Sequence, residues 1–153
     1  MQTNNELSRS ERALALLGGE RFVRLSAREL DDPAMVWRMI LAGVPVNSAQ
    51  HLREHSGLPR RLFDQVVCRT SLISAGKSKS QRLSKSMSEA IVRTAKIIAL
   101  AEQAFGDRER AMYWLNTPNA IFEEKAPITL IDTGSGTEWV KQVLVRMMYG
   151  IDA

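Results

Sequence analysis

Apolar residues recur every three or four positions along most of the chain, and this spacing predicts amphipathic helices. No stretch shows a sustained alternation of apolar and polar residues. The apolar run at residues 128–131 is the one candidate for a strand, and the sequence offers no partner strand for it. The pattern therefore predicts an all-α fold.

The first half of the chain is predicted to hold three short helices and a fourth helical piece, at residues 27–42, 45–55, 59–67 and 70–75. The core-facing residues expected in the first of these are Leu30, Ala34, Trp37 and Leu41. Gly43 follows as a stop, and Pro45 stands where a first helical turn tolerates proline. Short helices with tight connections are typical of a helix-turn-helix domain, although any small helical bundle gives a similar pattern.

Residues 1–28 are predicted to form an N-terminal extension to this domain. Leu14, Leu16 and Leu17 favour a short helix, which Gly18 and Gly19 interrupt. The sequence leaves open whether the extension is ordered. The helix-turn-helix domain is placed at residues 29–85 and a second, small helical domain at residues 86–153.

The second domain is predicted to begin with a long helix that starts near Ser86 or Ser88. Apolar residues on more than one of its sides predict that it is buried at the centre of the fold. Gly106 is expected to end this helix, and Asp107 is expected to cap the next one, at residues 108–115.

A proline ends that next helix. Pro118 pushes Thr117 out of helical geometry, so the end of the helix is expected to bring Trp114 and Leu115 into the core. Polar residues suited to a turn, Asn116 and Asn119, lie on either side of the break.

The last helix is predicted from a capping box. Ser135 and Glu138 have the required spacing, and Gly150 is expected to close the helix. One face of the helix carries Trp139, Val143 and Met147. An aromatic and methionine stripe is usually core, but at this place in the chain it equally favours an adaptable apolar surface for a partner. Pattern alone leaves both interpretations open.

Composition narrows the class of protein. The chain has 153 residues, of which 44% are hydrophobic and 25% charged, as expected for one globular unit or two small helical ones. Its apolar stretches are too short to span a membrane and residues 1–10 do not resemble a signal peptide, so a cytoplasmic protein without a membrane partner is expected. Cys68 is the single cysteine, which excludes an internal disulfide and favours a thiol in or near the core.

Charge is distributed unevenly along the chain. Residues 60–85 contain seven Lys and Arg residues and one acidic residue, a net charge of +6, whereas residues 100–153 have a net charge of −3. A basic middle and an acidic end are compatible with nucleic acid at one surface and a protein at another. A solvated basic loop is the alternative explanation.

Under the helix-turn-helix interpretation, the basic segment supplies the DNA contacts. Arg69, Thr70 and Ser71 would begin the recognition helix, where base edges are met. Phosphate contacts are expected from residues around it, which are Arg60, Arg61, Lys77, Lys79 and Arg82. The Ser- and Lys-rich stretch that holds Lys77 and Lys79 is equally typical of a flexible linker.

Two short motifs suggest chemistry. The sequence HLREH, from His51 to His55, matches the H-x-x-E-H pattern of a group of zinc peptidases, with Glu54 as base. Both histidines of the chain are used in this match, and Arg53 would place a positive charge inside the site. The sequence TGSGT, from Thr133 to Thr137, could hold an anion at a helix start but lacks the ending of a phosphate-binding loop. No catalytic set can be assembled, so we expect a protein that is not an enzyme and needs no cofactor.

Several residues together carry a resemblance to a known family. They are Arg82-Leu83-Ser84, Ser88, Ala101, Phe105-Gly106-Asp107, Ala111, the sequence WLNTPNAIF from Trp114 to Phe122, Pro127, Leu130, Thr133-Gly134, Val140, Leu144 and Tyr149-Gly150. In these positions the chain resembles the Xre-type antitoxins of toxin-antitoxin systems whose toxins carry a RES domain (the Xre/MbcA/ParS group). The resemblance is most specific over residues 82–150.

The resemblance implies a function. Antitoxins of this family join a helix-turn-helix domain to a toxin-binding domain, and their RES toxins deplete NAD. It implies steric inhibition of the toxin by the C-terminal helix and tail, through Trp139, Val143, Met147, Met148, Tyr149, Gly150, Ile151, Asp152 and Ala153. It further implies autorepression of the operon through operator DNA, by a homodimer within a larger toxin-antitoxin complex. A DNA-binding transcriptional regulator without a toxin partner is the alternative.

The sequence departs from the family pattern at three places. The recognition segment reads RTSLISAGK from Arg69, without the paired arginines usual there. The sequence EEKAP, from Glu123, lacks the glycine that commonly precedes the second proline, and GSGTE gives an unusual entry to the last helix. Contacts with DNA and with the toxin are expected to differ there.

Overall fold

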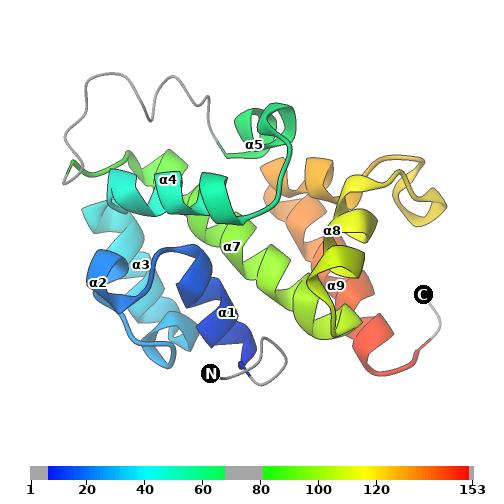
Figure 1. Ribbon diagram of the computed structural model, residues 1–153, viewed down its shortest axis with the longest axis horizontal. Helices are drawn as coiled ribbons and strands as arrows, with labels where there is room; N and C mark the ends of the chain where they lie inside the picture. Colours follow the sequence, from blue (N-terminus) through cyan, green and yellow to red (C-terminus); the bar gives the residue numbers. More distant parts are fainter. Residues whose placement is uncertain (1–6, 68–80, 152–153) are drawn as a thin grey trace.

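The computed structural model describes residues 7–67 and 81–151 of the 153-residue chain, and these residues form helices and no β-strands (Figure 1). The α-helices are α1 (Arg9–Leu16), α2 (Glu20–Val23), α3 (Pro33–Ala42), α4 (Val46–His55), α5 (Arg60–Val66), α7 (Lys85–Phe105), α8 (Arg108–Asn116) and α9 (Gly134–Met148). Three 3₁₀ helices join them: η1 (Glu29–Asp31), η2 (Ala120–Phe122) and η3 (Pro127–Asp132). The prediction of an all-helical chain is confirmed for this part of the protein.

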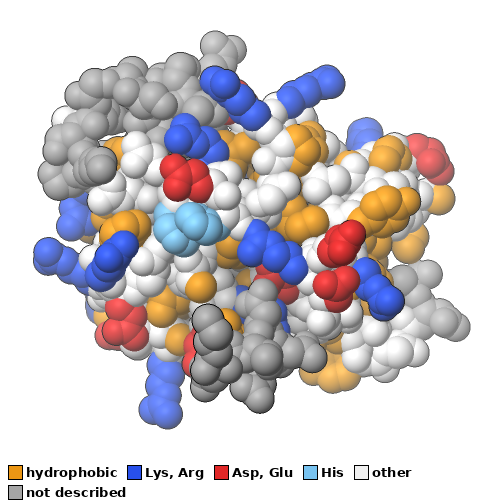
Figure 2. All heavy atoms as spheres, in the orientation of Figure 1, with side chains coloured by type: hydrophobic (Ala, Val, Ile, Leu, Met, Phe, Trp, Pro, Cys, Tyr) orange, Lys and Arg blue, Asp and Glu red, His pale blue; other side chains and the backbone are white. Residues whose placement is uncertain are grey.

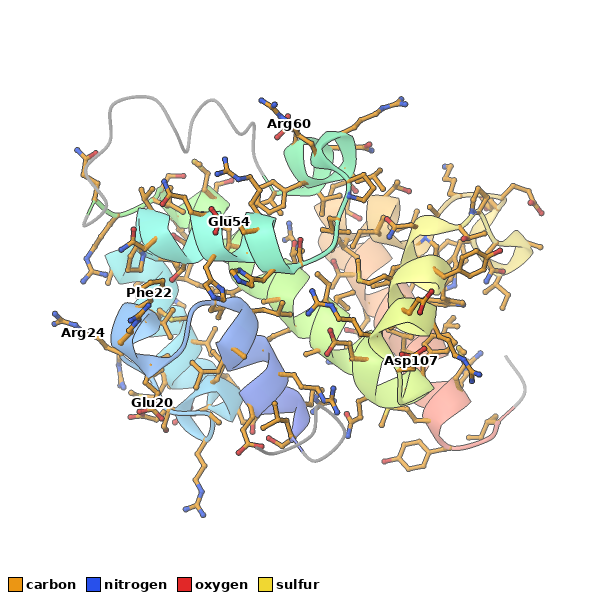
Figure 3. All side chains as sticks on the ribbon, in the orientation of Figure 1. Glu20, Phe22, Arg24, Glu54, Arg60 and Asp107 are labelled. Atoms are coloured by element: carbon orange, nitrogen blue, oxygen red, sulfur yellow. The ribbon has the colours of Figure 1, made fainter. Side chains whose placement is uncertain are left out.

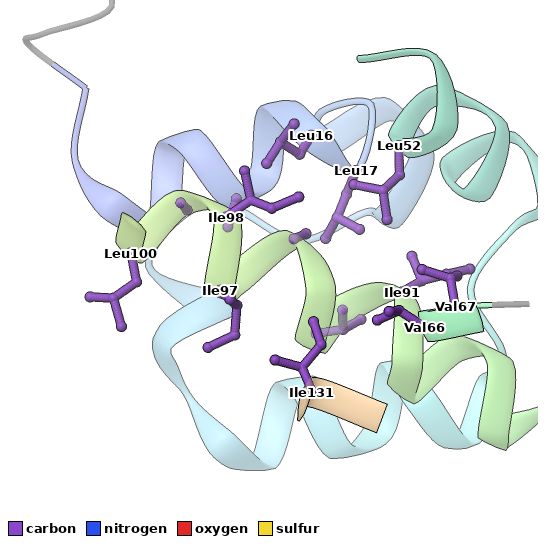
Figure 4. Close-up of a cluster of buried hydrophobic side chains, with 14 of the residues drawn as sticks. Leu16, Leu17, Leu52, Val66, Val67, Ile91, Ile97, Ile98, Leu100 and Ile131 are labelled. Atoms are coloured by element: carbon purple, nitrogen blue, oxygen red, sulfur yellow. The ribbon is translucent and has the colours of Figure 1, made fainter. Parts of the chain in front are cut away.

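Helix α7 crosses the centre of the molecule, as its apolar pattern predicted (Figure 1). It contacts α1, α3 and α4 on one side and α8, α9 and η3 on the other. Ile91, Ile98 and Ala95 on this helix are fully buried, and one continuous hydrophobic core surrounds it. Figure 4 shows side chains from α7 among residues of α1, α4, α5 and η3. The two predicted domains therefore share a core around α7.

The N-terminal segment is packed into this core from Ser8 onward. Ser8 caps α1 and forms a capping box with Glu11, and Leu16 and Leu17 are buried against α7 and α4. The predicted interruption at Gly18-Gly19 is confirmed, since Gly18 has φ of +93° and α1 ends just before it. A side chain on Gly18 would overlap the ring of Phe22.

The predicted core face of the first long helix was largely wrong. Leu30 is buried, but it lies in η1, and Ala34, Trp37 and Leu41 of α3 face solvent, with Trp37 59% exposed. Met39 is the buried residue of α3, and Val36 and Ile40 pack beside it. Helix α3 is apolar on most sides, so packing against α7, rather than periodicity, decides which face is inward.

Helices α4 and α5 begin one residue after the predicted limits and are joined by four residues. Leu52 of α4 and Phe63 and Val66 of α5 are buried, and α5 packs against η3 of the second half. The helical piece predicted at residues 70–75, and with it Cys68, lies outside the described residues. The helix-turn-helix assignment therefore stays a prediction.

The chain returns at residue 81 to pair with the connection between α3 and α4. The Val46 amide donates to Gln81 O and the Leu83 amide to Val44 O, each at 2.9 Å. Gly43 has φ of +87°, and a Cβ there would lie 2.6 Å from Leu83 O. The close approach of the two segments therefore requires glycine at position 43.

The two ends of α8 agree with the sequence in most respects. Gly106 is left-handed, and the carboxylate of Asp107 accepts the amides of Glu109 and Arg110, as predicted for a cap. Thr117 is extended before Pro118, and Leu115 is fully buried. The run predicted as a lone strand candidate is η3 instead.

The predicted capping box of the last helix was wrong by two residues. Helix α9 begins at Gly134, and Thr133 is its cap, with Oγ1 accepting the Gly136 amide at 3.0 Å. A Cβ on Gly136 would meet Leu130 O at 1.9 Å, so the preceding η3 fixes where the helix starts. The predicted end is confirmed: Gly150 has φ of +65°, and the Gly150 and Ile151 amides bond back to Met147 O and Arg146 O.

Candidate functional site

A chain of aromatic rings joins the elements of the second half. Phe105 of α7 contacts Trp114 of α8 with ring centroids 5.8 Å apart, Trp114 contacts Phe122 at 5.7 Å, and Phe122 contacts Trp139 of α9 at 5.1 Å. Phe122 is fully buried, whereas Trp139 is 38% exposed. The cluster therefore fixes α9 against η2 and α8 and brings one edge of an indole to the surface.

The apolar stripe of α9 was open to two interpretations, part of the core or a surface for a partner, and the structure shows some of each. Val140, Val143 and Leu144 are buried in the core, and Met147 and Met148 are partly buried against it. The stripe is therefore mainly core. The surface part lies at the ends of the helix, in Trp139 and in the residues after Met148.

The residues after α9 carry two large apolar groups that are strongly exposed. Tyr149 is 76% and Ile151 59% exposed, and the backbone bonds of Gly150 hold the turn between them. This turn lies at one end of the molecule, away from α5 (Figure 1). An ordered turn with two exposed large apolar side chains can meet a partner at low entropic cost.

The residues predicted to bind a toxin thus fall into three groups. Trp139, Tyr149, Gly150 and Ile151 are exposed, Met147 and Met148 are partly covered, and Val143 faces the core. Asp152 and Ala153 lie outside the described residues. In this conformation Val143 supports the helix and is not available to a partner.

Sequence reasoning missed two exposed apolar residues on the same half of the molecule. Tyr113 on α8 is 72% exposed and Ile121 in η2 is 38% exposed. Orange side chains are visible on the right of Figure 2, over α8 and the segment that follows it. Both residues lie within a pattern that predicts a buried helix end and turn, so only the fold shows that they point outward.

An ion pair in the interior connects the two halves of the chain. Arg12 Nη1 on α1 lies 3.3 Å from Glu102 Oε2 on α7, and both side chains are less than 10% exposed. Arg108 Nε, at the start of α8, lies 3.8 Å from Glu102 Oε1, which has no hydrogen-bond partner among the described residues. The carboxylate therefore holds α1 and α8 to the same turn of α7 by charge.

Part of the predicted DNA-binding set can be placed. Arg60 and Arg61 are exposed at the first turn of α5, and Figure 3 shows Arg60 extending away from the body of the protein. Arg82 is also at the surface, but its Nη1 donates to Gly43 O at 2.8 Å. This nitrogen is therefore already bonded within the protein. The other predicted contacts, Arg69, Thr70, Ser71, Lys77 and Lys79, lie outside the described residues.

The two histidines do not form a metal site in the described part of the chain. Their rings stack with centroids 4.0 Å apart, and His51 Nδ1 and His55 Nδ1 lie at 3.1 Å and 2.9 Å from the carbonyl oxygens of Leu16 and His51. Figure 2 shows them side by side on one face. Within the described residues, 7–67 and 81–151, no three His, Cys, Asp or Glu side chains are grouped closely enough to hold a metal ion. The zinc-peptidase alternative therefore has no third ligand in the described residues.

Within the same residues, no helix is both long and apolar enough to cross a membrane.

Several polar residues that carry the family resemblance fix the starts of helices and turns. Ser84 caps α7, and the buried Ser88 Oγ accepts the Val44 amide at 2.8 Å. Asn119 Oδ1 accepts the Ile121 amide at 3.0 Å at the start of η2. These polar motif residues therefore act as caps and turn formers, whereas apolar motif residues such as Leu115, Phe122 and Leu144 are fully buried in the core.

Comparison with known proteins agrees with this geometry. Residues 100–150 match the family model described as the antitoxin Xre/MbcA/ParS C-terminal toxin-binding domain. The chain is also similar to a protein named antitoxin Xre from Pseudomonas putida (strain KT2440), with 31% identity over 87 residues. That alignment covers 57% of this chain and 54% of the relative, so the chain spans about half the length of the curated relative it matches.

The match agrees with the resemblance over the C-terminal third of the chain, where residues 100–150 are similar to the toxin-binding domain of Xre/MbcA/ParS antitoxins. The matched family is described as a toxin-binding domain of antitoxins.

Proposed function

We propose, from the toxin-binding domain at residues 100–150, that this protein is an antitoxin that binds and sterically inhibits a NAD-depleting RES-domain toxin. The observation that carries the proposal is the exposed apolar turn at Tyr149 and Ile151, held at the end of a domain of this type. Inhibition by occupation of the toxin's active site requires no catalytic group on the antitoxin. The contact needs only a shape that excludes NAD.

The contact surface has an anchored and a projecting part. Trp139 is fixed by the ring of Phe122, so its exposed edge loses little conformational entropy on binding. Tyr149 and Ile151 project beyond the helix and supply the larger apolar area. Tyr and Trp are the residue types that dominate the energetics of protein interfaces, so we place the main binding energy on Tyr149 and Trp139.

A test of inhibition measures NAD in cells that express a RES toxin encoded beside this protein. The full chain should preserve NAD, and a variant lacking residues 148–153 should not. If both preserve it, inhibition resides elsewhere in residues 100–150. If neither does, the partner is not a RES toxin.

The proposal includes repression of the operon by DNA binding as a homodimer. Arg60 and Arg61 support it, because they are exposed at the N-terminal turn of α5, where the helix dipole also favours phosphate. The alternative of a DNA-binding regulator without a toxin partner uses the same surface. The two are distinguished by the toxin assay and not by DNA binding.

DNA binding is tested by the salt dependence of affinity for the operator region. A plot of log K against log salt concentration has a negative slope, and each lost phosphate contact should make that slope shallower by about 0.9. Replacing Arg60 and Arg61 by Gln should therefore reduce the slope and the affinity together. Arg110→Gln, which removes an exposed arginine on α8, is the matched control and should change neither. Equal effects of the two variants would refute the assignment of DNA contacts to α5.

A further inference from the structure

A cavity of about 520 Å³ lies where the N-terminal segment meets the start of α9. Its walls come from α1, η1, α3, α7 and the first turns of α9. This volume is within the range of roughly 300–1,000 Å³ that is usual for small-molecule sites. The antitoxin function proposed above assigns no role to this cavity.

Four cationic side chains line the cavity: Arg9, Arg93, Lys96 and Lys141. In the described part of the chain, none of them forms an ion pair within 4.0 Å, although acidic residues also line the walls. Lys96 Nζ donates to Leu30 O at 3.0 Å, and the buried Nε of Arg93 has no hydrogen-bond partner. Hydrogen-bond donors with positive charge therefore line this cavity, Lys96 and Arg93 partly buried and Arg9 and Lys141 at its exposed rim.

The charges in the cavity act on each other. Burial lowers the pKa of Lys96, and the nearby charges of Arg9 and Lys141 lower it further, while Asp31 opposes them. The lining contains three acidic residues, Asp31, Glu89 and Glu138, so an excess of one positive charge remains. Asp31 already accepts a hydrogen bond from the Ser10 hydroxyl. A small anion would neutralise this excess positive charge, whereas the three carboxylates would repel a polyanion.

The start of α9 adds donors to the same place. Gly134 lines the cavity, and the first amides of a helix have no partner within the helix. Thr133 caps the Gly136 amide, and within the described residues the amide of Gly134 is left without an acceptor. The sequence TGSGT, which suggested an anion at a helix start, therefore lies beside the cationic cavity.

Apolar side chains form the rest of the wall and limit the kind of ligand. They include Leu30, Val36, Ile40, Val92 and Ile97. Such a surface accommodates an apolar or aromatic ring better than a hydrated inorganic ion.

We propose that this cavity binds a small phosphorylated molecule with a ring, of the size of a mononucleotide. The phosphate would lie between Arg9, Lys96, Lys141 and the first amides of α9, and the ring against the aliphatic wall. The ligand would join α1 and α7 to α9, the helix that ends at the proposed toxin-binding turn. The inference does not depend on the identity of the toxin.

The proposal is tested by isothermal titration of the full chain with AMP, and with adenosine as the control that lacks the phosphate. AMP should bind at least about tenfold more tightly than adenosine, which corresponds to about 1.4 kcal/mol. Lys141→Gln and Lys96→Gln should each weaken AMP binding at least about tenfold, because each removes a charged donor from the phosphate. Lys141 is exposed, so its variant tests the site without disturbing the core.

Two controls locate the site. Lys85→Gln changes an exposed lysine of α7 that does not line the cavity, and the double variant Arg60→Gln, Arg61→Gln removes the basic surface of α5. Both should bind AMP as the unchanged chain does. Equal binding of AMP and adenosine, no binding of AMP, or loss of binding only in the α5 variant would overturn the proposal. A failure of toxin binding in the separate NAD assay would leave it standing.

Discussion

The pair formed by Arg12 and Glu102 offers the sharpest test of how the two halves of the protein are joined. Both side chains are at least nine-tenths buried and lie 90 positions apart in the sequence. At an effective dielectric constant of about 20, two unit charges about 3.3 Å apart attract each other by roughly 5 kcal/mol before desolvation is considered. Removal of one partner leaves the other charge buried, which costs about 3–5 kcal/mol in comparable pairs.

A double-mutant cycle separates the interaction energy of the Arg12–Glu102 pair from the effect of losing each side chain's packing. Arg12→Met and Glu102→Met should each lower the free energy of unfolding by about 3 kcal/mol or more. The double variant should lose clearly less than the sum, because neither charge is then stranded. Urea unfolding followed by tryptophan fluorescence measures all four proteins. The partly buried Arg108 still lies near Glu102 when Arg12 is replaced, so Glu102→Met should be the more harmful single change.

The cycle has a matched control and a refuting outcome. Arg110 and Asp107 form an exposed pair at 3.9 Å on the same part of the chain, and Arg110→Met should cost no more than about 1 kcal/mol. Losses below about 1 kcal/mol for both members of the buried pair, or full additivity in the double variant, would show that Glu102 does not hold α1 to α7.

Three further predictions concern the fold and its dependence on pH. Gly43→Ala should lower the free energy of unfolding by about 1–3 kcal/mol in urea unfolding, because the left-handed backbone and the nearby Leu83 carbonyl both oppose a Cβ; an unchanged midpoint would contradict this. The Ser26 amide and hydroxyl lower the pKa of Glu29, so the stability advantage over Glu29→Gln should be full above pH 4.5 and fall as pH drops through the lowered value. Burial lowers the pKa of Lys96, so the stability of the chain relative to Lys96→Met should rise as pH increases from that lowered value toward 10.5, which pH-dependent unfolding would show or disprove.

Features set by local chemistry were predictable from the sequence. Gly106, Asp107 and Pro118 end or begin helices where expected, because each acts through its own backbone or its nearest amides. The apolar pattern of α7 identified it as the central helix, because a helix that is apolar on several sides must be buried. These signals do not depend on which other element packs nearby.

Features set by contacts between distant segments were not predictable. Trp37 has the spacing of a core residue, but packing against α7 selects another face of α3. The start of α9 depends on the Leu130 carbonyl beside Gly136, and the burial of Glu102 depends on an arginine from a segment whose order was open. The exposed Tyr113 was missed because its helix pattern gives no sign that one side of α8 is uncovered.

The central claim is that the turn after α9 binds the toxin, and the dissociation constant for a catalytically inactive RES toxin tests it most directly. The double variant Tyr149→Ala, Ile151→Ala should weaken binding by at least about 2 kcal/mol, or roughly 30-fold, with unchanged thermal unfolding. Trp37→Ala removes an aromatic group on α3 that is 59% exposed, and it should leave the constant unchanged. Unaltered affinity in the double variant, or an equal loss in Trp37→Ala, would contradict the account.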